Sequence, residues 1–235
     1  MNVALLLSGG TGTRLGGTVP KQYMEVNGRP IISYSLERLS KSREIDRIHI
    51  VAEPSWREPI QGWLATYERE KKYAGTSLPG ENRQLSILSG LRDIRRYAED
   101  TDYVLVHDAA RPLLSERQIA DCLRAAQGHD GALPVLPMKD TVYLSESGKT
   151  VSGLLDRGHV YAGQAPEAFR LGTYYEANLR LLPDRILEIR GASEPAVLAG
   201  LDIVMIPGDE ENFKITTRAD LERFRRMTRE GGETE

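Results

Sequence analysis

The sequence predicts an α/β, Rossmann-like fold: a mainly parallel, twisted sheet with helices on both faces and a projecting β-hairpin arm. Three observations lead to this fold. A continuous apolar run at residues 3–7 ends at a cluster of glycines, which is typical of the first strand of a parallel sheet. Short apolar segments then alternate with helical segments, as in βαβ units. After Asp140 this alternation stops and a hairpin pattern follows.

The elements are expected in a regular order. Pro30 stands near the start of the first helical pattern, and Ser115 is expected to cap a later helix. Residues 77–82 are rich in turn formers and predict a loop. The predicted strands are residues 3–7, 48–52, 102–107, 131–135 and 202–207, and the predicted helices are residues 30–40, 58–67, 84–97, 116–127, 171–182 and 218–229.

The hairpin is expected at residues 141–151, with residues 146–149 as its turn. It would form an arm at about residues 139–160 that projects from a single domain covering residues 1–230, with a disordered tail at 231–235. Projecting hairpins often exchange contacts between subunits, so a homodimer through this arm is expected.

Composition excludes several classes of protein. The 235 residues include 31 basic and 34 acidic ones, a net charge of −3, which argues against a nucleic-acid binder that works through a global basic field. A local basic pocket for a small anion stays open. The single cysteine, Cys122, excludes an intrachain disulfide and fits a cytoplasmic location. The apolar start is too short for a membrane span, so no membrane contact is expected.

The loop after the first strand carries five glycines in ten residues, from Ser8 to Gly17. Glycine lets backbone N–H groups approach a ligand closely, and such a turn is where α/β sheets bind phosphate. The Walker pattern fails because no Gly-Lys-Ser/Thr follows, and the dinucleotide pattern fails because Leu15 replaces its third glycine. Arg14 and Lys21 could hold a triphosphate from two sides, although composition alone equally allows an ordinary glycine-rich turn with two surface cations.

These residues resemble those of the sugar-nucleotide-forming nucleotidyltransferases. Pro20-Lys21-Gln22-Tyr23 is similar to the branch that makes CDP-linked polyols, which includes the 2-C-methyl-D-erythritol 4-phosphate and ribitol-5-phosphate cytidylyltransferases. The resemblance covers roughly residues 3–225 and continues through Gly80-Glu81-Asn82-Arg83, Ser86, residues 106–112, Lys139-Asp140-Thr141, Asp156-Arg157 and residues 212–216.

The resemblance implies transfer of CMP from CTP to a polyol phosphate, most simply 2-C-methyl-D-erythritol 4-phosphate of isoprenoid synthesis, with release of pyrophosphate. A phosphomonoester has a second pKa of about 6, so the nucleophile is already largely a dianion at neutral pH. Catalysis then needs cations and a carboxylate-held metal rather than a general base.

The resemblance also assigns roles to residues. Arg14, Lys21 and Lys214 would be catalytic, and Asp108, at the end of a strand, would hold Mg²⁺. Nucleotide binding would fall to Gly9, Gly10, Gly12, Thr13, Gly80, Arg83 and Ser86, and acceptor binding to Arg111, Thr141 and Arg157. A turn, a helix start or a solvated lysine would account for several of these residues without any function.

The pattern breaks on the acceptor side. The family usually has Gln-Thr-Pro-Gln where this chain has Gln164-Ala165-Pro166-Glu167, and its Thr-Asp-(Asp/Glu)-Ala segment is replaced within residues 189–196. Ser193 and Glu194 are candidates to replace the missing polar groups. The start Ser8-Gly9-Gly10 is closer to the ribitol-phosphate enzymes, whereas residues 107–112 favour the methylerythritol enzymes.

Three alternatives therefore stay open. The acceptor could be ribitol 5-phosphate or another polyol phosphate used in wall or capsule polymers. The chain could be a non-catalytic nucleotide-binding homologue, or a nucleotidyltransferase that uses UTP or GTP.

Overall fold

The computed structural model of the chain describes residues 1–10 and 19–230. Within them, eight strands form one sheet: β1 (Asn2–Leu7), β4 (Arg47–Val51), β5 (Tyr73–Ser77), β6 (Tyr103–Asp108), β7 (Gly131–Pro137), β10 (Tyr161–Gly163), β11 (Glu167–Arg170) and β12 (Ile203–Pro207). The hydrogen-bonded order runs β10-β7-β11-β6-β1-β4-β5, and β12 pairs with β7.

The prediction of a mainly parallel α/β sheet is confirmed. β1 pairs in parallel with both β4 and β6, β4 with β5, and β12 with β7. Two strands are antiparallel to their neighbours. β11 lies between β6 and β7, where it pairs with residues 131–132 of β7, and β10 pairs with residues 135–137 of β7. Neither of these short strands was expected, because their three or four residues carry no alternating apolar pattern.

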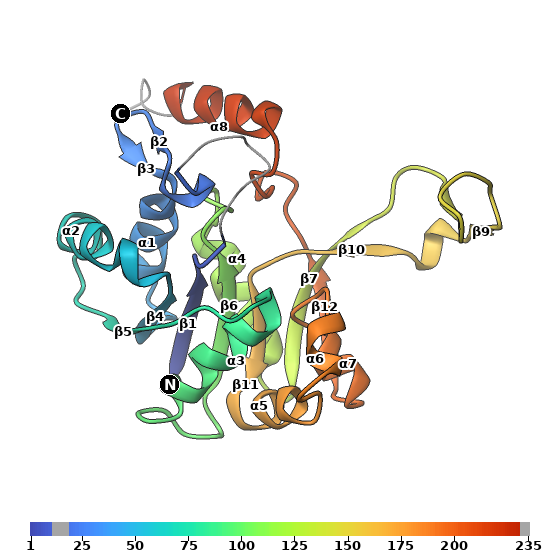
Figure 1. Cartoon of the computed structure of the whole chain (residues 1–235), viewed down its shortest axis with the longest axis horizontal. Coiled ribbons are helices and arrows are strands. Elements are labelled where there is room, and N and C mark those ends of the chain that lie inside the picture. Colours follow the sequence, from blue (N-terminus) through green and yellow to red (C-terminus); the bar gives the residue numbers. More distant parts are fainter. Residues whose placement is uncertain (11–18, 231–235) are drawn as a thin grey trace.

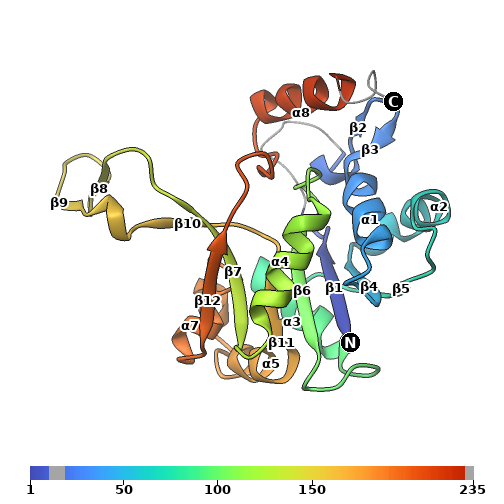
Figure 2. The same cartoon turned by 180° about the vertical axis from the view of Figure 1, so that it is seen from behind.

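Helices cover both faces of the sheet, as expected. In β1, the alternate residues Ala4 and Leu6 pack toward one face and Val3 and Leu5 toward the other, and all four are fully buried. The first face is covered by α1 (Ile31–Lys41), α2 (Arg57–Tyr67) and α4 (Glu116–Ala126), and the second by α3 (Arg83–Ile94), α5 (Leu171–Leu179) and α7 (Glu194–Leu198). Figure 1 shows α3 in front of the sheet, and Figure 2, seen from behind, shows α4 in front of it.

Smaller elements complete the structure. α6 (Arg185–Glu188) packs on α3 through Ile186 and Leu88. α8 (Arg218–Glu230) packs through Phe224 beside α1 and the short pair β2 (Glu25–Val26) and β3 (Arg29–Pro30). The predicted helix 84–97 ends at Ile94, because Arg96 and Tyr97 bond to carbonyls three residues back. The extent of the single domain stays a prediction, and the predicted tail 231–235 lies outside the described residues.

The arm projects away from the sheet in both views (Figures 1 and 2). Its strands are β8 (Val142–Leu144) and β9 (Gly153–Leu155), with Val142 opposite Leu155. The predicted turn at residues 146–149 was therefore too short, because the connection runs from 145 to 152. Side chains hold this longer loop: Ser145 Oγ donates to the Thr150 carbonyl at 2.6 Å, and Gly148 takes a φ of +69°.

Stability should depend on the protonation of His49, which is 3% exposed. Its Nε2 lies 2.8 Å from Ser77 Oγ, and burial lowers its pKa from 6.5 to about 4 against the opposing charge of Asp93. The imidazole of His49 therefore binds a proton more tightly in the unfolded chain than in the folded one. As the pH falls below 6.5, this difference lowers the free energy of unfolding.

We expect His49 to lower the free energy of unfolding by about 2 kcal/mol between pH 7 and pH 5. Urea titrations of the wild type and His49→Gln at both pH values isolate this contribution from those of other groups, because only the difference between the two proteins is read. An unchanged difference at pH 7 and pH 5 would contradict the assignment.

Candidate active site

A cavity of about 550 Å³ opens at the carboxyl ends of the parallel strands, where open α/β sheets bind ligands. Leu7 and Asp108, the last residues of β1 and β6, both line it. Of the predicted site residues, the structure brings eight to this cavity: Gly9, Gly10, Lys21, Gly80, Arg83, Ser86, Asp108 and Lys214.

The start of the glycine loop is held by the residues after Lys21. Gln22 is 3% exposed, and its Nε2 donates to the carbonyls of Ser8 and Gly10 at 2.6 and 2.7 Å. The Tyr23 hydroxyl donates to the Ser8 carbonyl at 2.9 Å. Gln22 and Tyr23 thus hold the start of the glycine loop against the segment that carries Lys21, which lines the cavity. The sequence motif alone did not assign this role to them.

Both tryptophans of the chain lie beside this anchor. The ring of Tyr23 stacks on Trp56 at 4.2 Å and lies 5.5 Å from Trp63. Since Tyr23 contacts the glycine loop directly, tryptophan fluorescence should report ligand binding in the cavity.

The loop also packs closely against residues 79–80. A Cβ on Gly9 would lie 2.5 Å from the Cβ of Pro79, and a Cβ on Gly80 would lie 2.3 Å from the Cβ of Leu85 and 2.8 Å from its backbone carbon. Among residues 1–10 and 19–230, a Cβ on Gly10 would have no neighbour within 4 Å. Glycine is therefore required by contact at Gly9 and Gly80, whereas the described residues set no such requirement at Gly10.

We expect Gly9→Ala to destabilise the protein by about 1–3 kcal/mol, as overpacked substitutions do. Gly10→Ala is the matched control and should change stability by less than about 0.5 kcal/mol. Thermal or urea unfolding of the two variants tests this difference. Equal stabilities would show that the contact with Pro79 does not constrain the loop.

The N-terminus of α3 borders the same cavity. Asn82 caps it by accepting from Leu85 N–H at 2.8 Å, and its own amide donates to the Ile186 carbonyl at 2.8 Å. Ser86 Oγ accepts from Gly80 N–H at 3.0 Å and donates to the Asn82 carbonyl. From the sequence, Ser86 was given a nucleotide-binding role but Asn82 was named only as part of a motif, although an asparagine directly before a helical run is a recognised N-cap signal.

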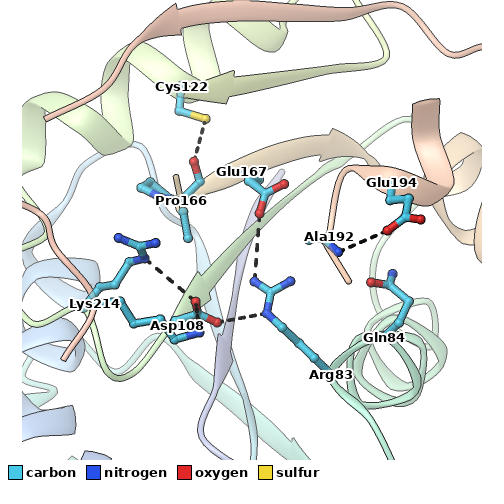
Figure 3. Close-up of polar contacts among 12 residues, drawn as sticks. Arg83, Gln84, Asp108, Cys122, Pro166, Glu167, Ala192, Glu194 and Lys214 are labelled. Carbon is cyan, nitrogen blue, oxygen red and sulfur yellow. Dashed lines mark hydrogen bonds and ion pairs between the residues drawn. The ribbon is translucent and has the colours of Figure 1, made fainter. Parts of the chain in front are cut away.

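Asp108 is the centre of the site's charges (Figure 3). Its Oδ1 accepts from Arg83 Nε at 3.1 Å, and its Oδ2 accepts from Lys214 Nζ at 2.9 Å. Arg111 Nε lies 3.9 Å from the same Oδ2. Three cations from distant parts of the chain therefore meet one carboxylate that is 8% exposed.

Burial and these cations act on the acids in opposite directions. Burial raises the pKa of Asp108, but the guanidinium of Arg83 and the ammonium of Lys214 outweigh it and hold that pKa well below its usual range. Glu167 lies beside Arg83 at 3.9 Å, and burial raises its pKa to about 7 against the weaker influence of Arg83. Sequence reasoning noted Glu167 only as a break in a motif.

A second group of bonds holds the cations in place. Arg111 Nη1 donates to the Asn212 carbonyl at 2.7 Å, and the Asn212 side chain donates to the Ala165 carbonyl at 2.8 Å. Ile215 N–H bonds to the Ala110 carbonyl at 2.9 Å, next to Lys214. Arg111, a predicted acceptor residue, contacts Asp108 and Asn212 and is not among the residues that line the cavity.

The remaining predicted residues are elsewhere. Thr141 and Arg157 are exposed on the arm, where Arg157 donates to the Lys139 carbonyl at 2.8 Å, and neither lines the cavity. Gly12, Thr13 and Arg14 lie outside the described residues.

Comparison with known proteins decides the family. A sequence model described as IspD, 2-C-methyl-D-erythritol 4-phosphate cytidylyltransferase, matches residues 2–229. The enzyme of that name from Rubrobacter xylanophilus is 38% identical over 93% of this chain and 91% of its own length. The chain belongs to the IspD family. The resemblance drawn from the sequence motifs is therefore confirmed, and the chain is a cytidylyltransferase.

Other IspD relatives widen the comparison. The ribitol-5-phosphate cytidylyltransferase of Vibrio parahaemolyticus is 31% identical over 94% of this chain and 93% of its own length. The chain spans about half the length of relatives named bifunctional enzyme IspD/IspF. The crystal structure of 4-diphosphocytidyl-2C-methyl-D-erythritol synthase from Anaerococcus prevotii has the same fold, with a TM-score of 0.82 at 24% identity over 97% of this chain and 96% of that one.

Two of the departures from the IspD pattern, Ala165 and Glu194, make contacts with other parts of the backbone and side chains of the described chain. Ala165 is 3% exposed, and its carbonyl is bound by Asn212. The Glu194 carboxylate accepts from the backbone N–H groups of Arg190 and Gly191 at 2.8 and 3.3 Å. Glu194 therefore closes its own loop in this arrangement, which does not favour it as a replacement acceptor contact.

Proposed function

We propose that this cytidylyltransferase transfers the CMP group of CTP to 2-C-methyl-D-erythritol 4-phosphate and releases pyrophosphate. The observation that carries the proposal is the convergence of Lys21, Arg83 and Lys214 with Asp108 in one cavity beside a glycine loop. The choice of acceptor is supported by the higher identity to a relative of that name, 38%, than to the ribitol-5-phosphate relative, 31%.

The reaction needs charge compensation above all. An acceptor phosphate oxygen forms a bond to the α-phosphorus of CTP, the bond from that phosphorus to the bridging oxygen of the β-phosphate breaks, and the electron pair leaves with pyrophosphate. Both reactants are anions, so fixed cations that meet the developing charge lower the barrier. We assign this role to Lys21 and Lys214, with Arg14 as a third cation predicted from the motif.

The nucleotide is bound by the surrounding loops. Gly9 and Gly10, with the predicted Gly12 and Thr13, would approach the phosphates, and Gly80, Arg83 and Ser86 would hold the nucleotide from the other side of the cavity. The closeness of Gly80 to Leu85 keeps that wall compact, which favours a small pyrimidine over a purine.

Asp108 fits the predicted Mg²⁺ when the metal arrives with the nucleotide. Among the residues described, no cluster of three or more acidic, histidine or cysteine side chains is placed to hold a metal. Of the carboxylates that line the cavity, Asp108 is the one at the end of β6 that Arg83 and Lys214 hold. Magnesium ordinarily binds one or two carboxylates and takes its other ligands from phosphates and water. When bound, it would neutralise charge on the triphosphate.

We extend the proposal to the arm. Thr141 and Arg157 are exposed on it, and Tyr143, Leu144 and Leu154 present apolar side chains that are 51–65% exposed. In a homodimer the arm would bury this surface and carry Thr141 and Arg157 to the acceptor side of the partner's cavity, near Arg111. No helix of the described chain is long and apolar enough to cross a membrane; a cytoplasmic location stays a prediction from the single cysteine.

Ribitol 5-phosphate is the second candidate acceptor. Ala165 and Glu167 replace family residues. Ala165 is linked to Arg111 through Asn212, and Glu167 lies 3.9 Å from Arg83. The ribitol-5-phosphate relatives match nearly the whole chain.

Pyrophosphate release with CTP and a panel of polyol phosphates tests the proposal. We expect kcat/KM with 2-C-methyl-D-erythritol 4-phosphate to exceed that with ribitol 5-phosphate by at least about tenfold, which corresponds to about 1.4 kcal/mol. The reverse order would establish the second candidate. Turnover that is faster with UTP or GTP, or activity unchanged in Lys21→Ala, would contradict the assigned nucleotide site.

A further inference from the structure

Glu167 is a buried carboxylate with bonding capacity that the structure leaves unused. It begins β11 opposite Val106, so it lies near Asp108 at the end of the neighbouring strand β6. It is 6% exposed, its Oε1 lies 3.9 Å from Arg83 Nη2, and its Oε2 has no hydrogen-bond partner among the residues that the structure describes. A buried polar atom without a partner calls for an explanation.

Arg83 lies between two carboxylates. Its Nε donates to Asp108 at 3.1 Å, while its Nη2 faces Glu167 at a distance too long for a hydrogen bond (Figure 3). A guanidinium has five N–H donors in a planar fork, so it can bind either acid. A shift of about 1 Å would bring Nη2 within the usual 2.7–2.9 Å of a charged pair.

The proposed metal site favours such a shift. Each oxygen of Asp108 already accepts one bond, Oδ1 from Arg83 and Oδ2 from Lys214. A carboxylate oxygen can accept more than one partner, but a divalent cation bound at Asp108 would lie beside both cations and repel them. Arg83 is the one with a second carboxylate beside it, because Glu167 lies within reach.

We propose that Glu167 is a positioning residue: it receives Arg83 when Asp108 releases it to the metal–nucleotide complex. This inference rests on the proposed function, since it requires a metal at Asp108. Glu167 keeps the released guanidinium paired and holds it in the nucleotide cavity. The side chain of Arg83 is 28% exposed, so an unpaired state would leave a largely desolvated charge.

Glu167→Gln is the sharpest variant. It keeps the size of the side chain and one acceptor oxygen but removes the charge, and its amide adds donors that repel the guanidinium. Glutamine is also the residue that the family pattern leads one to expect here, so the variant should fold. The matched control is Glu188→Gln on α6, where an exposed carboxylate is removed away from the cavity.

The probe is Mn²⁺, titrated into the full chain saturated with α,β-methylene CTP, without acceptor, so that no turnover occurs. Calorimetry or the Mn²⁺ electron paramagnetic resonance signal gives the metal affinity. We expect Glu167→Gln to weaken Mn²⁺ binding about tenfold, as loss of residues that support a metal ligand does, and Glu188→Gln to leave it unchanged. Binding of the analogue without metal, read by tryptophan fluorescence, should change less than about threefold, because Arg83 then stays on Asp108.

Equal Mn²⁺ affinity in Glu167→Gln and wild type would overturn the inference while leaving the proposed function intact. No Mn²⁺ binding by wild type would remove the metal from Asp108 and refute this inference together with the proposed metal site, while the proposed transfer reaction would still be tested by pyrophosphate release. A loss of analogue binding equal to the loss of metal binding would show a purely structural role. If Glu167→Gln fails to fold, a crystal structure of the wild type with Mn²⁺ and the analogue decides: we expect Arg83 Nη2 within about 3.2 Å of Glu167, and Arg83 still bonded to Asp108 would overturn the inference.

Discussion

Lys214→Ala is expected to lower kcat/KM for CTP by about 10³. Removing one pre-positioned group that stabilises transition-state charge costs about 10²–10³ in rate, and Lys214 also compensates Asp108 at 2.9 Å. The backbone that carries this ammonium is fixed, because the next residue, Ile215, is fully buried and its N–H donates to the Ala110 carbonyl. Steady-state pyrophosphate release measures the loss.

Two controls separate position from charge. Lys41→Ala removes an exposed lysine on α1 that is paired with Glu37 of the same helix, and the activity of this variant should match the wild type. Lys214→Arg keeps the charge but not the compact ammonium, so it should recover part of the activity. A Lys214→Ala enzyme within about threefold of wild type would remove this lysine from the catalytic group.

Asp108→Asn is expected to lower both activity and stability. At neutral pH the ionised carboxylate compensates Arg83, Lys214 and, at 3.9 Å, Arg111. Because these cations hold its pKa well below the usual range, the folded state favours the ionised form; the associated stability is present above the unfolded pKa and is lost only as the pH falls through the folded one. Breaking a buried ion pair by removing one partner costs about 3–5 kcal/mol.

We therefore expect Asp108→Asn to lose a few kcal/mol in urea unfolding at pH 7 and to lower kcat/KM by at least about 10³, since it would also lose the proposed metal. Asp121→Asn is the matched control: its partner Arg117 is exposed on the surface of α4, and such pairs contribute about 0–1 kcal/mol. Equal stability of Asp108→Asn and Asp121→Asn would show that the charge cluster does not stabilise the fold.

The core of the cavity was predictable because it follows from topology. A run such as residues 3–7 indicates a buried parallel strand, and the residues after each such strand meet at one edge of the sheet. Gly9, the turn at Gly80 and Asp108 therefore meet at one cavity although together they span about 100 residues of the sequence. Their chemistry, glycine and carboxylate, is local and can be recognised in the sequence.

Other features depend on contacts that leave no local pattern. β11 is a short antiparallel strand inserted between β6 and β7, and only this insertion places Glu167 beside Arg83. The bonds from Asn212 to Ala165 and from Gln164 to Asp209 connect segments about 45 residues apart. Polar side chains in such bonds have no periodicity in the sequence. The residues that hold the cavity-lining side chains in place therefore could not be predicted from spacing.

The arm shows a third limit. Its position was predicted from the break in the βαβ rhythm, and its base is closed by the bond from Met138 N–H to the Val160 carbonyl. Thr141 and Arg157 do not meet the cavity of their own chain, because the arm extends away from the sheet (Figure 1). Their proposed role depends on a second subunit, which the sequence of one chain does not describe.

The central claim is that this cavity directs an acceptor phosphate to the α-phosphorus of CTP. The most direct test compares [α-³²P]CTP with [γ-³²P]CTP in the presence of 2-C-methyl-D-erythritol 4-phosphate. We expect the α-label to appear in a CDP-linked polyol and the γ-label only in pyrophosphate, and both signals to fall in Lys214→Ala. Transfer of the γ-label to the acceptor, or release of α-label only as free CMP, would contradict it.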